Sequence, residues 1–591
     1  MSKDNSQMDV VFGTQRHRST DSPFRSALNL VLTALLAALS LVASSAAQSA
    51  VINATSPSLT DVTTAIHSAT DGDTVTIPKG TAAWGSTIKI SKGITLIGQT
   101  TTDPVHKTAD DQTIISVNTG TNGNTPLIVL DTAFGKSYRL SGITFRTGQT
   151  QIVNSNGMVQ LQGGSHAVRV DHCHFDDLPY ENNYVAVWRA LYGVIDHNVF
   201  DFRSPNNHAQ SLYINMSDWG GRSYGDGSWA EPPYYGSEKF VFIEDNCFNN
   251  TTSNEFAGVI DGWRGGRYVF RHNHAYNATP TNHGTEIGRE RGFRCAEIYN
   301  NDFHFTDARG SLGGTRSGGW ISHDNTVDGQ QLARGATLGT YRVFFAFIGA
   351  PFTGASGDNP WDYNVTEWDG RHIDGHPPYL FESGSASSGS DGTHIVDLTK
   401  NWRANQWIGY AAKRLSDGKI ALVFSNTTNT LNVYYHDGYG GGPIWQAGDQ
   451  YQIHKVLVAL DQPGRGASDL INTASPAWPH QQLEPCYEWN DVYTPTGAHL
   501  MMTQAVGAFA VLQQGRDFYN TVMPGYAPYI YPHPLTGGVG TPPPPPSTCA
   551  QLQQRLDRLQ RRQQRLQRLH RSNQKLNRRI RRLQQQLQNC P

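Results

Sequence analysis

Six short copies of one pattern decide the fold of this chain. They are VRVDHCHF (168–175), GVIDHNVF (193–200), VFIEDNCF (241–248), VFRHNHAY (269–276), EIYNNDFH (297–304) and WISHDNTV (320–327). Aligned, the copies share a column that holds Cys173, Asn198, Asn246, Asn273, Asn301 and Asn325. The intervals along this column are 25, 48, 27, 28 and 24 residues, and 48 is close to two periods. A unit of about 25 residues that contains an alternating strand followed by Asn predicts a solenoid of stacked turns.

The composition and the length of the repeat favour an all-β right-handed parallel β-helix. Fifty-nine glycines and a charged fraction of only 16% are typical of strands and turns. The repeat is too short for a propeller blade, which needs about 40 residues and four strands. Turns of a β-helix stack about 4.8 Å apart, so equivalent residues form ladders in which asparagines satisfy one another's hydrogen bonds.

A helix is expected to cap the first turn of this solenoid. Ser58 is a candidate N-cap, and Leu59, Val62 and Ile66 follow it at helical spacing. Such a helix covers apolar side chains and strand edges that the end of a solenoid would otherwise expose.

Changes in composition divide the rest of the chain. We expect the β-helix at residues 48–385 and 456–540, interrupted by a small β-module at 386–455 that begins with a Ser/Gly-rich stretch. The pattern of this module indicates a role in packing or in ligand binding. A stiff polyproline linker follows at 541–548, and a helical tail occupies 549–591.

The first 47 residues have the pattern of a secretory signal peptide. Arginines at 16, 18 and 25 precede an apolar run from Ala27 to Ala43, and small residues follow up to Ala47. The alternative is an uncleaved signal anchor, because this run nearly suffices to span a bilayer. Either reading predicts a protein that is exported, and the first predicts a secreted, extracellular one.

The tail is strongly basic. From Cys549 onward, eleven Arg and one Lys against one Asp give +11, so with −2 for the whole chain the remainder carries −13. Two leucine-rich runs with a slip of phase near Ser572 predict either an antiparallel hairpin closed by a Cys549–Cys590 disulfide or a parallel coiled coil. We expect the tail to contact an anionic cell surface or polysaccharide, with self-association left open and no nucleic acid as partner. The other four cysteines lack metal spacing and are expected to be buried.

Counting back from the asparagine column brings like charges onto neighbouring turns. Nine residues back are Arg189, Arg264 and Arg316, and Arg291 lies next to that position in the turn that ends at Asn301. Stacked like charges repel, and they persist more readily when a ligand or counter-ion lies between them. The alternative is that loop lengths differ and the alignment is accidental.

A second column, two residues before the asparagines, carries carboxylates. These are Asp171, Asp196 and Glu244. The same argument from repulsion makes them a candidate cation site.

The arginines and carboxylates between 261 and 316 form the candidate groove. The candidate catalytic residues are Asp261, Arg264, Glu286, Arg289, Glu290, Arg291 and Arg316. Arginine forks bind uronate carboxylates, and flat indole faces pack on sugar rings. The candidate substrate-binding residues are therefore Arg189, Trp188, Trp263 and Trp320, although each Trp is also a natural packing residue.

The stretch HAVRVDHCHF followed by GVIDHNVF, together with the expected cap helix, resembles the pectate lyase-like right-handed β-helix superfamily. Lyases of that superfamily carry a Trp-Ile-Asp-His motif. Asp171-His172 and Asp196-His197 match its Asp-His, whereas Arg and Val stand at the Trp position. The resemblance implies calcium as a cofactor, held by carboxylates such as Asp171, Asp196 and Glu244, and an arginine as base in β-elimination.

Two functions of different classes follow from these patterns. The first is a secreted β-helix enzyme, a polysaccharide lyase or glycoside hydrolase, that cleaves an acidic polysaccharide in the charged groove. The second is a non-catalytic adhesin or matrix protein, because the same superfamily includes tailspikes and adhesins and the fold does not choose among them.

Overall fold

The computed structural model describes residues 49–537 apart from short gaps. The gaps are 118–125, 148–155, 178–182, 205–209, 253–256, 285–290, 308–309, 331–333, 340–342, 346–379, 409, 435–442, 460, 467–481, 506–507 and 509–511. The expected signal peptide, the polyproline linker and the tail with Cys549 and Cys590 lie outside the described residues.

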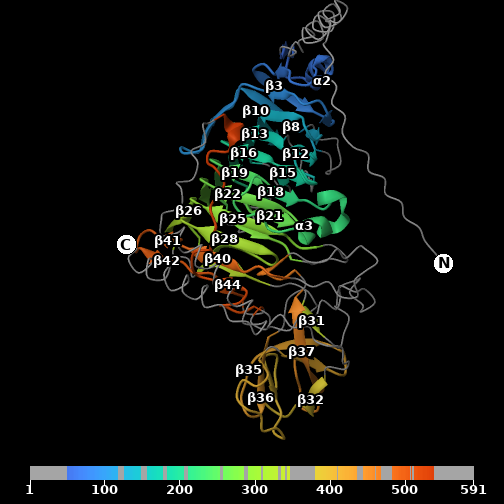
Figure 1. Cartoon of the computed structure of the whole chain (residues 1–591), viewed down its shortest axis with the longest axis vertical. Coiled ribbons are helices and arrows are strands. Elements are labelled where there is room, and N and C mark those ends of the chain that lie inside the picture. Colours follow the sequence, from blue (N-terminus) through green and yellow to red (C-terminus); the bar gives the residue numbers. More distant parts are fainter. Residues whose placement is uncertain are drawn as a thin grey trace, which may run out of the picture. The chain divides into compact units, whose positions relative to one another are not determined.

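Three long sheets run side by side through the main body (Figure 1). Sheet A orders its strands as β1 (Val51–Asn53), β2 (Thr74–Thr76), β5 (Thr95–Ile97), β10 (Ser137–Ser141), β13 (Ala167–Asp171), β16 (Gly193–Asp196), β19 (Val241–Glu244), β22 (Arg267–Arg271), β25 (Cys295–Tyr299), β28 (Gly319–His323), β40 (Cys486–Trp489) and β44 (Phe518–Tyr519).

Sheet B orders its strands as β3 (Gly80–Trp84), β8 (Thr113–Val117), β11 (Thr144–Thr147), β14 (His174–Asp176), β17 (Val199–Phe202), β20 (Cys247–Asn250), β23 (His274–Tyr276), β26 (Asp302–Phe305), β29 (Thr326–Gly329), β41 (Val492–Tyr493) and β42 (Ala498–His499). Sheet C orders its strands as β4 (Ile88–Ile90), β9 (Ile128–Thr132), β12 (Val159–Gly163), β15 (Asn183–Trp188), β18 (Gln210–Asn215), β21 (Ile260–Trp263), β24 (Pro280–Asn282), β27 (Ser311–Thr315), β30 (Arg334–Leu338) and β43 (Thr503–Gln504).

Each turn of the chain contributes one strand to each sheet. For example, β13, β14 and β15 follow one another in sequence, and β16, β17 and β18 pair with them in parallel. Neighbouring strands in the three sheets are parallel except for the final β41–β42 pair. The fold class expected from the sequence, a right-handed parallel β-helix, is confirmed.

The predicted asparagine column forms a continuous ladder at the turn between sheets A and B. The backbone N–H and the side-chain Nδ2 of Asn246 both donate to Oδ1 of Asn273, at 3.0 and 3.1 Å. Asn273 donates in the same way to Asn301 at 3.0 Å. Cys173 begins the ladder by donating its N–H to Asn198, as the alignment predicted. Because every amide group is paired, these buried polar side chains carry little unmet desolvation cost.

Two details of this turn were not predicted. The ladder ends on a carboxylate, because Asn325 donates to Oδ1 of Asp491 at 2.9 and 2.8 Å. The residue before each ladder position is left-handed, with φ between 51° and 57° at His172, His197, Asp245, His272, Asn300, Asp324 and Asn490. Asn and Asp tolerate this conformation better than other residues, and four of these seven positions carry one of them.

Apolar side chains from all three sheets fill the interior. Phe145, Phe175, Phe200 and Phe248 stack on successive turns with ring centroids 5.2, 4.7 and 4.9 Å apart. Outward-facing residues alternate with these, so the chemistry of each sheet lies on its outer face.

The cap helix, α2 (Leu59–Ser68), is confirmed. Ser58 accepts the N–H of Asp61 at 3.2 Å, and Val62 and Ile66 are buried. At the other end the ammonium of Lys92 donates to three main-chain carbonyls, at 2.6 to 3.1 Å. That contact satisfies carbonyls that a helix leaves open at its C-terminus.

A long connection between β18 and β19 contains the short helices η1 (Trp219–Gly221), η2 (Ser223–Gly225) and α3 (Asp226–Ala230). Three buried arginines hold it against the body. Arg267 donates to the carbonyls of Ser228, Pro232 and Pro233, while the guanidiniums of Arg291 and Arg294 lie 5.0 and 5.2 Å from the ring of Trp229. A hairpin of β6 (Thr101–Asp103) and β7 (Thr108–Asp110) forms a smaller excursion.

An antiparallel sheet overlaps the region expected as a β-module, 386–455, and extends beyond it at both ends. Its strands are β31 (Val343–Phe345), β32 (Leu380–Ser385), β33 (His394–Val396), β34 (Tyr410–Arg414), β35 (Ile420–Asn426), β36 (Thr430–Tyr434) and β37 (Gln450–Ala459). The sheet has its own apolar core with Trp402, Trp407 and Trp445. After it, β38 (Arg465–Gly466) pairs with β39 (Gln482–Leu483) before the chain re-enters sheet A.

The residues after β44 cover the outer face of sheet A. This C-terminal segment, 526–537, includes η5 (Pro534–Thr536). Its carbonyls at Tyr529 and Ile530 accept hydrogen bonds from Arg271, and the N–H of His533 donates to Glu244 at 2.7 Å.

None of the described helices is long and apolar enough to cross a bilayer. Cys173, Cys247, Cys295 and Cys486 are buried and unpaired, as expected.

Candidate functional site

The outer face of sheet C gathers several of the predicted site residues. Leu212 and Ile214 of β18 point into the core, so Tyr213 between them points outward. Tyr213 lies next to Asp261 in the register of β18 and β21, and the same pairing aligns Asn215 with Trp263. The outer face therefore places Asp261 and Trp263 of β21 beside side chains of the neighbouring turn.

Three side chains of this face form a hydrogen-bonded relay. Nε2 of His283 lies 2.7 Å from Oδ2 of Asp261, and the guanidinium of Arg316 lies 2.9 Å from Nδ1 of His283. Arginine can only donate, so Nδ1 must accept and the proton of a neutral imidazole resides on Nε2, facing the carboxylate. Gln210 donates a further bond to Asp261 at 3.0 Å. The relay fixes both the orientation and the tautomer of His283.

The relay is partly open to solvent. The side chain of His283 is 27% exposed, whereas that of Asp261 is only 4% exposed. A solvent-facing imidazole backed by a buried carboxylate is the arrangement in which a carboxylate can stabilise an imidazolium after proton transfer.

Aromatic rings extend along the face from this relay toward the earlier turns. The ring centroids of Trp188 and Tyr213 are 5.5 Å apart, those of Tyr213 and Trp263 are 6.5 Å apart, and those of Trp263 and His283 are 5.3 Å apart. The guanidinium of Arg264 lies over the ring of Trp263 at 4.7 Å. Trp188 and Trp263 are half-buried, so each keeps part of its surface open to a ligand.

The predicted arginine stripe lies in the turns between sheets C and A. Arg189, Arg264 and Arg316 directly follow β15, β21 and β27, with φ of 74° at Arg189 and 44° at Arg264. The count from the asparagine column placed them correctly at equivalent corners, but they lie on alternate turns, so the expectation of arginines on neighbouring turns is corrected. Arg189 is 57% exposed and lies 3.5 Å from Asp218.

Two other predicted site residues lie away from this face. Arg291 is fully buried, and its guanidinium bonds to Asp461 and Asp226 at 2.7 to 3.1 Å. Trp320 of β28 is also fully buried, within the core of the β-helix. The expectations of a catalytic Arg291 and a sugar-binding Trp320 are corrected accordingly. Glu286, Arg289 and Glu290 lie outside the described residues.

The predicted carboxylate column exists, but its carboxylates pair with arginines. Asp171 pairs with Arg139 at 2.6 Å and Asp196 pairs with Arg169 at 2.7 Å, and both carboxylates are buried. Burial alone would raise the pKa of Asp171, but its hydrogen bonds with Arg139 and His172, together with the nearby charges of Arg169 and Arg139, outweigh burial and lower it.

The third carboxylate of the column is covered as well. Glu244 pairs with Arg271 at 2.6 Å, both side chains are fully buried, and burial raises the pKa of Glu244 despite this partner. Each carboxylate of this column is therefore paired with an arginine.

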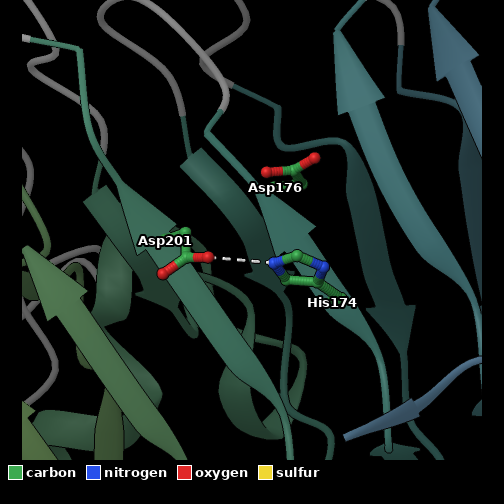
Figure 2. Close-up of side chains that lie close together, drawn as sticks. All are labelled: His174, Asp176 and Asp201. Carbon is green, nitrogen blue, oxygen red and sulfur yellow. Dashed lines mark hydrogen bonds and ion pairs between the residues drawn. The ribbon is translucent and has the colours of Figure 1, made fainter. Parts of the chain in front are cut away.

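The described residues contain one further cluster of metal-ligand types, on the outer face of sheet B (Figure 2). His174 bonds to Asp201 at 3.1 Å and to Asp111 at 2.8 Å, and Asp176 lies close by and bonds to Arg146. Burial alone would lower the pKa of His174, but its hydrogen bonds to Asp111 and Asp201 raise it to about 9. His174, Asp111 and Asp201 are thus joined by hydrogen bonds, and Arg146 pairs with Asp176 beside them.

Sequence reasoning placed neither Tyr213 nor His283 in the site. Strict alternation in QSLYIN (210–215) would have pointed Tyr213 outward, because Leu212 and Ile214 occupy the core positions. His283 follows β24 on the turn between those of Asp261 and Arg316. Because the loops differ in length, counting residues along the chain does not show that these three residues are neighbours.

Comparisons with known proteins found only weak similarities to solved structures. The chain matches no protein-family profile and no curated protein. Among solved structures it is similar to the PL6 family alginate lyase AlyGC, with 15% identity, a TM-score of 0.28 and coverage of 50% of this chain and 40% of that one. The chain thus matches two fifths of that lyase's length.

Two phage proteins are similar at the same level. Geobacillus virus E2 ORF18 shows 15% identity and a TM-score of 0.29, covering 76% of this chain and 81% of that one. The tailspike protein of E. coli bacteriophage HK620, in complex with a pentasaccharide, shows 11% identity and a TM-score of 0.25, covering 65% and 87%. The chain is a β-helix protein. The pairing of its own strands establishes this.

Proposed function

We propose that this protein is a carbohydrate-active enzyme that cleaves an acidic polysaccharide by β-elimination on the outer face of sheet C. The observation that supports this most is the Asp261–His283–Arg316 relay. In it His283 is the base, Asp261 is the carboxylate that orients it and Arg316 is the cation, and the contacts are 2.7 and 2.9 Å long. Export, as predicted from the N-terminus, would bring such an enzyme to polysaccharides outside the cell.

Substrate binding is assigned to the arginines and indoles of this face. Arg316 and Arg264 offer planar forks that match a uronate carboxylate. Trp188 and Trp263 offer half-buried faces on which sugar rings can pack. The face combines, within a few turns, the charge and the flat apolar surface that an acidic sugar requires.

The relay supplies a route for the proton. When a substrate carboxylate binds the guanidinium of Arg316, Nδ1 of His283 loses the hydrogen bond from Arg316. The lone pair of Nδ1 then becomes available. The imidazole then removes the proton from the carbon next to the carboxylate, and Asp261 stabilises the imidazolium. The electrons of the C–H bond form a carbon–carbon double bond as the glycosidic C–O bond breaks. Tyr213, beside Asp261 on the same face, can donate a proton to the departing oxygen.

Hydrolysis is less well supported by these residues. A glycoside hydrolase needs two carboxyl groups facing one linkage. Asp261 is almost buried and already accepts bonds from His283 and Gln210, which suits it to orient the imidazole.

A panel of polygalacturonate, alginate and chondroitin tests the proposal. We expect an unsaturated product that absorbs in the ultraviolet from one of them, and turnover reduced at least about a hundredfold in His283→Asn. A chelator is expected to leave turnover unchanged, because the carboxylate column is bonded to arginines. Saturated products would overturn elimination in favour of hydrolysis. Binding without cleavage would favour the non-catalytic adhesin.

A further inference from the structure

We infer that Asp461 is a positioning residue for His283 and Arg316. The effect of this role on turnover rests on the proposed function. Asp461 follows β37, the strand by which the chain leaves the antiparallel sheet of the 386–455 region. It is fully buried and left-handed, with φ of 57°. Its side chain and its carbonyl bond to the two turns that carry His283 and Arg316, and these turns can pass its effect on to the chemistry.

The side chain of Asp461 holds the segment that follows His283. Its two carboxylate oxygens accept Nε of Arg291 at 3.0 and 2.9 Å, and Oδ1 accepts Nη2 at 2.7 Å. Oδ2 also accepts the backbone N–H of Gly292 at 3.0 Å. The next N–H, that of Phe293, donates to the carbonyl of His283 at 3.1 Å. The carboxylate is therefore two hydrogen bonds away from the main chain of His283.

The main chain of Asp461 holds the turn that carries Arg316. Its carbonyl accepts the N–H of Gly318 at 2.9 Å. Within this turn, Oγ of Ser317 donates to the carbonyl of His283 at 2.7 Å. Asp461 thus holds both turns, and the turn that carries Arg316 also supports His283.

Close packing leaves little freedom between the two turns. A Cβ on Gly292 would lie only 2.6 Å from both Cβ and Oγ of Ser317. A shift in either turn would therefore be transmitted to the other. Misplacement of reacting groups by about 1 Å can cost a hundredfold in rate, so the 2.9 Å contact between Arg316 and His283 depends on this alignment.

The first test is Asp461→Asn, which keeps the size of the side chain but weakens its double contact with Arg291. Arg291 keeps its second partner, Asp226, at 3.1 Å. We expect kcat to fall about tenfold and KM to change less than about twofold, because alignment and not affinity is disturbed.

Asp517→Asn serves as the matched control. Asp517 is also a fully buried aspartate, and it pairs with Arg516. Its substitution is expected to lower stability without changing kcat. An equal loss of kcat in both variants would overturn the inference, since both effects would then follow from stability.

Amide hydrogen exchange gives a readout that needs no activity. In Asp461→Asn we expect peptides spanning 283–294 to exchange at least about fivefold faster, because the Phe293 N–H loses its support, while Asp517→Asn leaves them unchanged. Unchanged exchange in Asp461→Asn overturns the positioning role, whatever the turnover. If the wild type cleaves no polymer but exchange responds as expected, the proposed function fails and the structural linkage stands. Arg291→Lys, which keeps the charge but not the fork, replaces Asp461→Asn should that variant not fold, with the same expected outcomes.

Discussion

The outer faces of sheets A and C both carry stacked charges, yet they use them differently. On sheet A, Arg271 and Glu244 are fully buried and pair at 2.6 Å beneath the C-terminal segment. Beside sheet C, His283 and Arg189 remain 27% and 57% exposed, and aromatic rings lie next to the relay. Burial separates the two faces more clearly than charge does. A ladder of charged residues indicates a ligand only where the fold leaves it uncovered.

The largest effect is expected from breaking a buried pair on sheet A. Arg271→Met leaves Glu244 buried without its partner and removes the bonds to Tyr529 and Ile530 that fasten the C-terminal segment. The free energy of unfolding should fall by about 3–5 kcal/mol. Chemical denaturation followed by circular dichroism measures this. A loss under about 1 kcal/mol would show that the pair is not what holds the segment.

The counterpart on sheet C is Asp261→Asn, which should spare stability and lower turnover. The asparagine keeps an acceptor for Gln210 and His283 but cannot stabilise an imidazolium, so we expect kcat to drop about a hundredfold. Asp131→Asn is the control, since Asp131 pairs with Lys89 at 2.7 Å in another strand of the same sheet. Equal losses of activity in both variants would remove the special role of Asp261.

The fold could be predicted almost entirely from the sequence, because a β-helix repeats itself. The asparagine column fixed the period, and the period showed which positions are equivalent, including the corners that hold Arg189, Arg264 and Arg316, although these lie on alternate turns. The site could be predicted only in part. Asp261 and Trp263 lie on a strand in register, whereas His283 lies after a strand whose following loop has its own length. The cover over Glu244 comes from residues almost 290 positions away (|i−j| = 289), which no local pattern contains.

A pH-dependent contribution to the free energy of unfolding should distinguish the covered face of sheet A from the open face of sheet C. Burial raises the pKa of Glu297, beneath Tyr526 of the C-terminal segment, to about 7. The folded state therefore binds more protons than the unfolded state between about pH 4.5 and 7, and stability from this group falls as pH rises through that window. We expect about 2–3 kcal/mol over the window, and Glu297→Gln should remove it.

Unfolding free energies at pH 5 and pH 7.5 measure this contribution. The difference between the two values should be smaller in Glu297→Gln than in the wild type. His174 acts in the same direction at higher pH: its raised pKa of about 9 gives stability that is complete below about pH 6.5 and lost as pH rises through 9. An identical pH dependence in Glu297→Gln and the wild type would contradict the assignment to Glu297.

The smallest effect is expected from the exposed end of the arginine stripe. Arg189 and Asp218 lie 3.5 Å apart in an exposed pair, and such pairs contribute about 0–1 kcal/mol, so Arg189→Ala should leave unfolding almost unchanged. It should instead raise KM two- to threefold for an acidic polymer, and less at high salt, because the lost contact is a screened charge. Arg169→Ala is the comparison on sheet A: there the arginine is 12% exposed and bonded to buried Asp196 at 2.7 Å, so stability should fall and KM should not change. If both variants altered stability alike and neither altered KM, the arginines of sheet C would be structural too, and exposure would no longer separate the two faces.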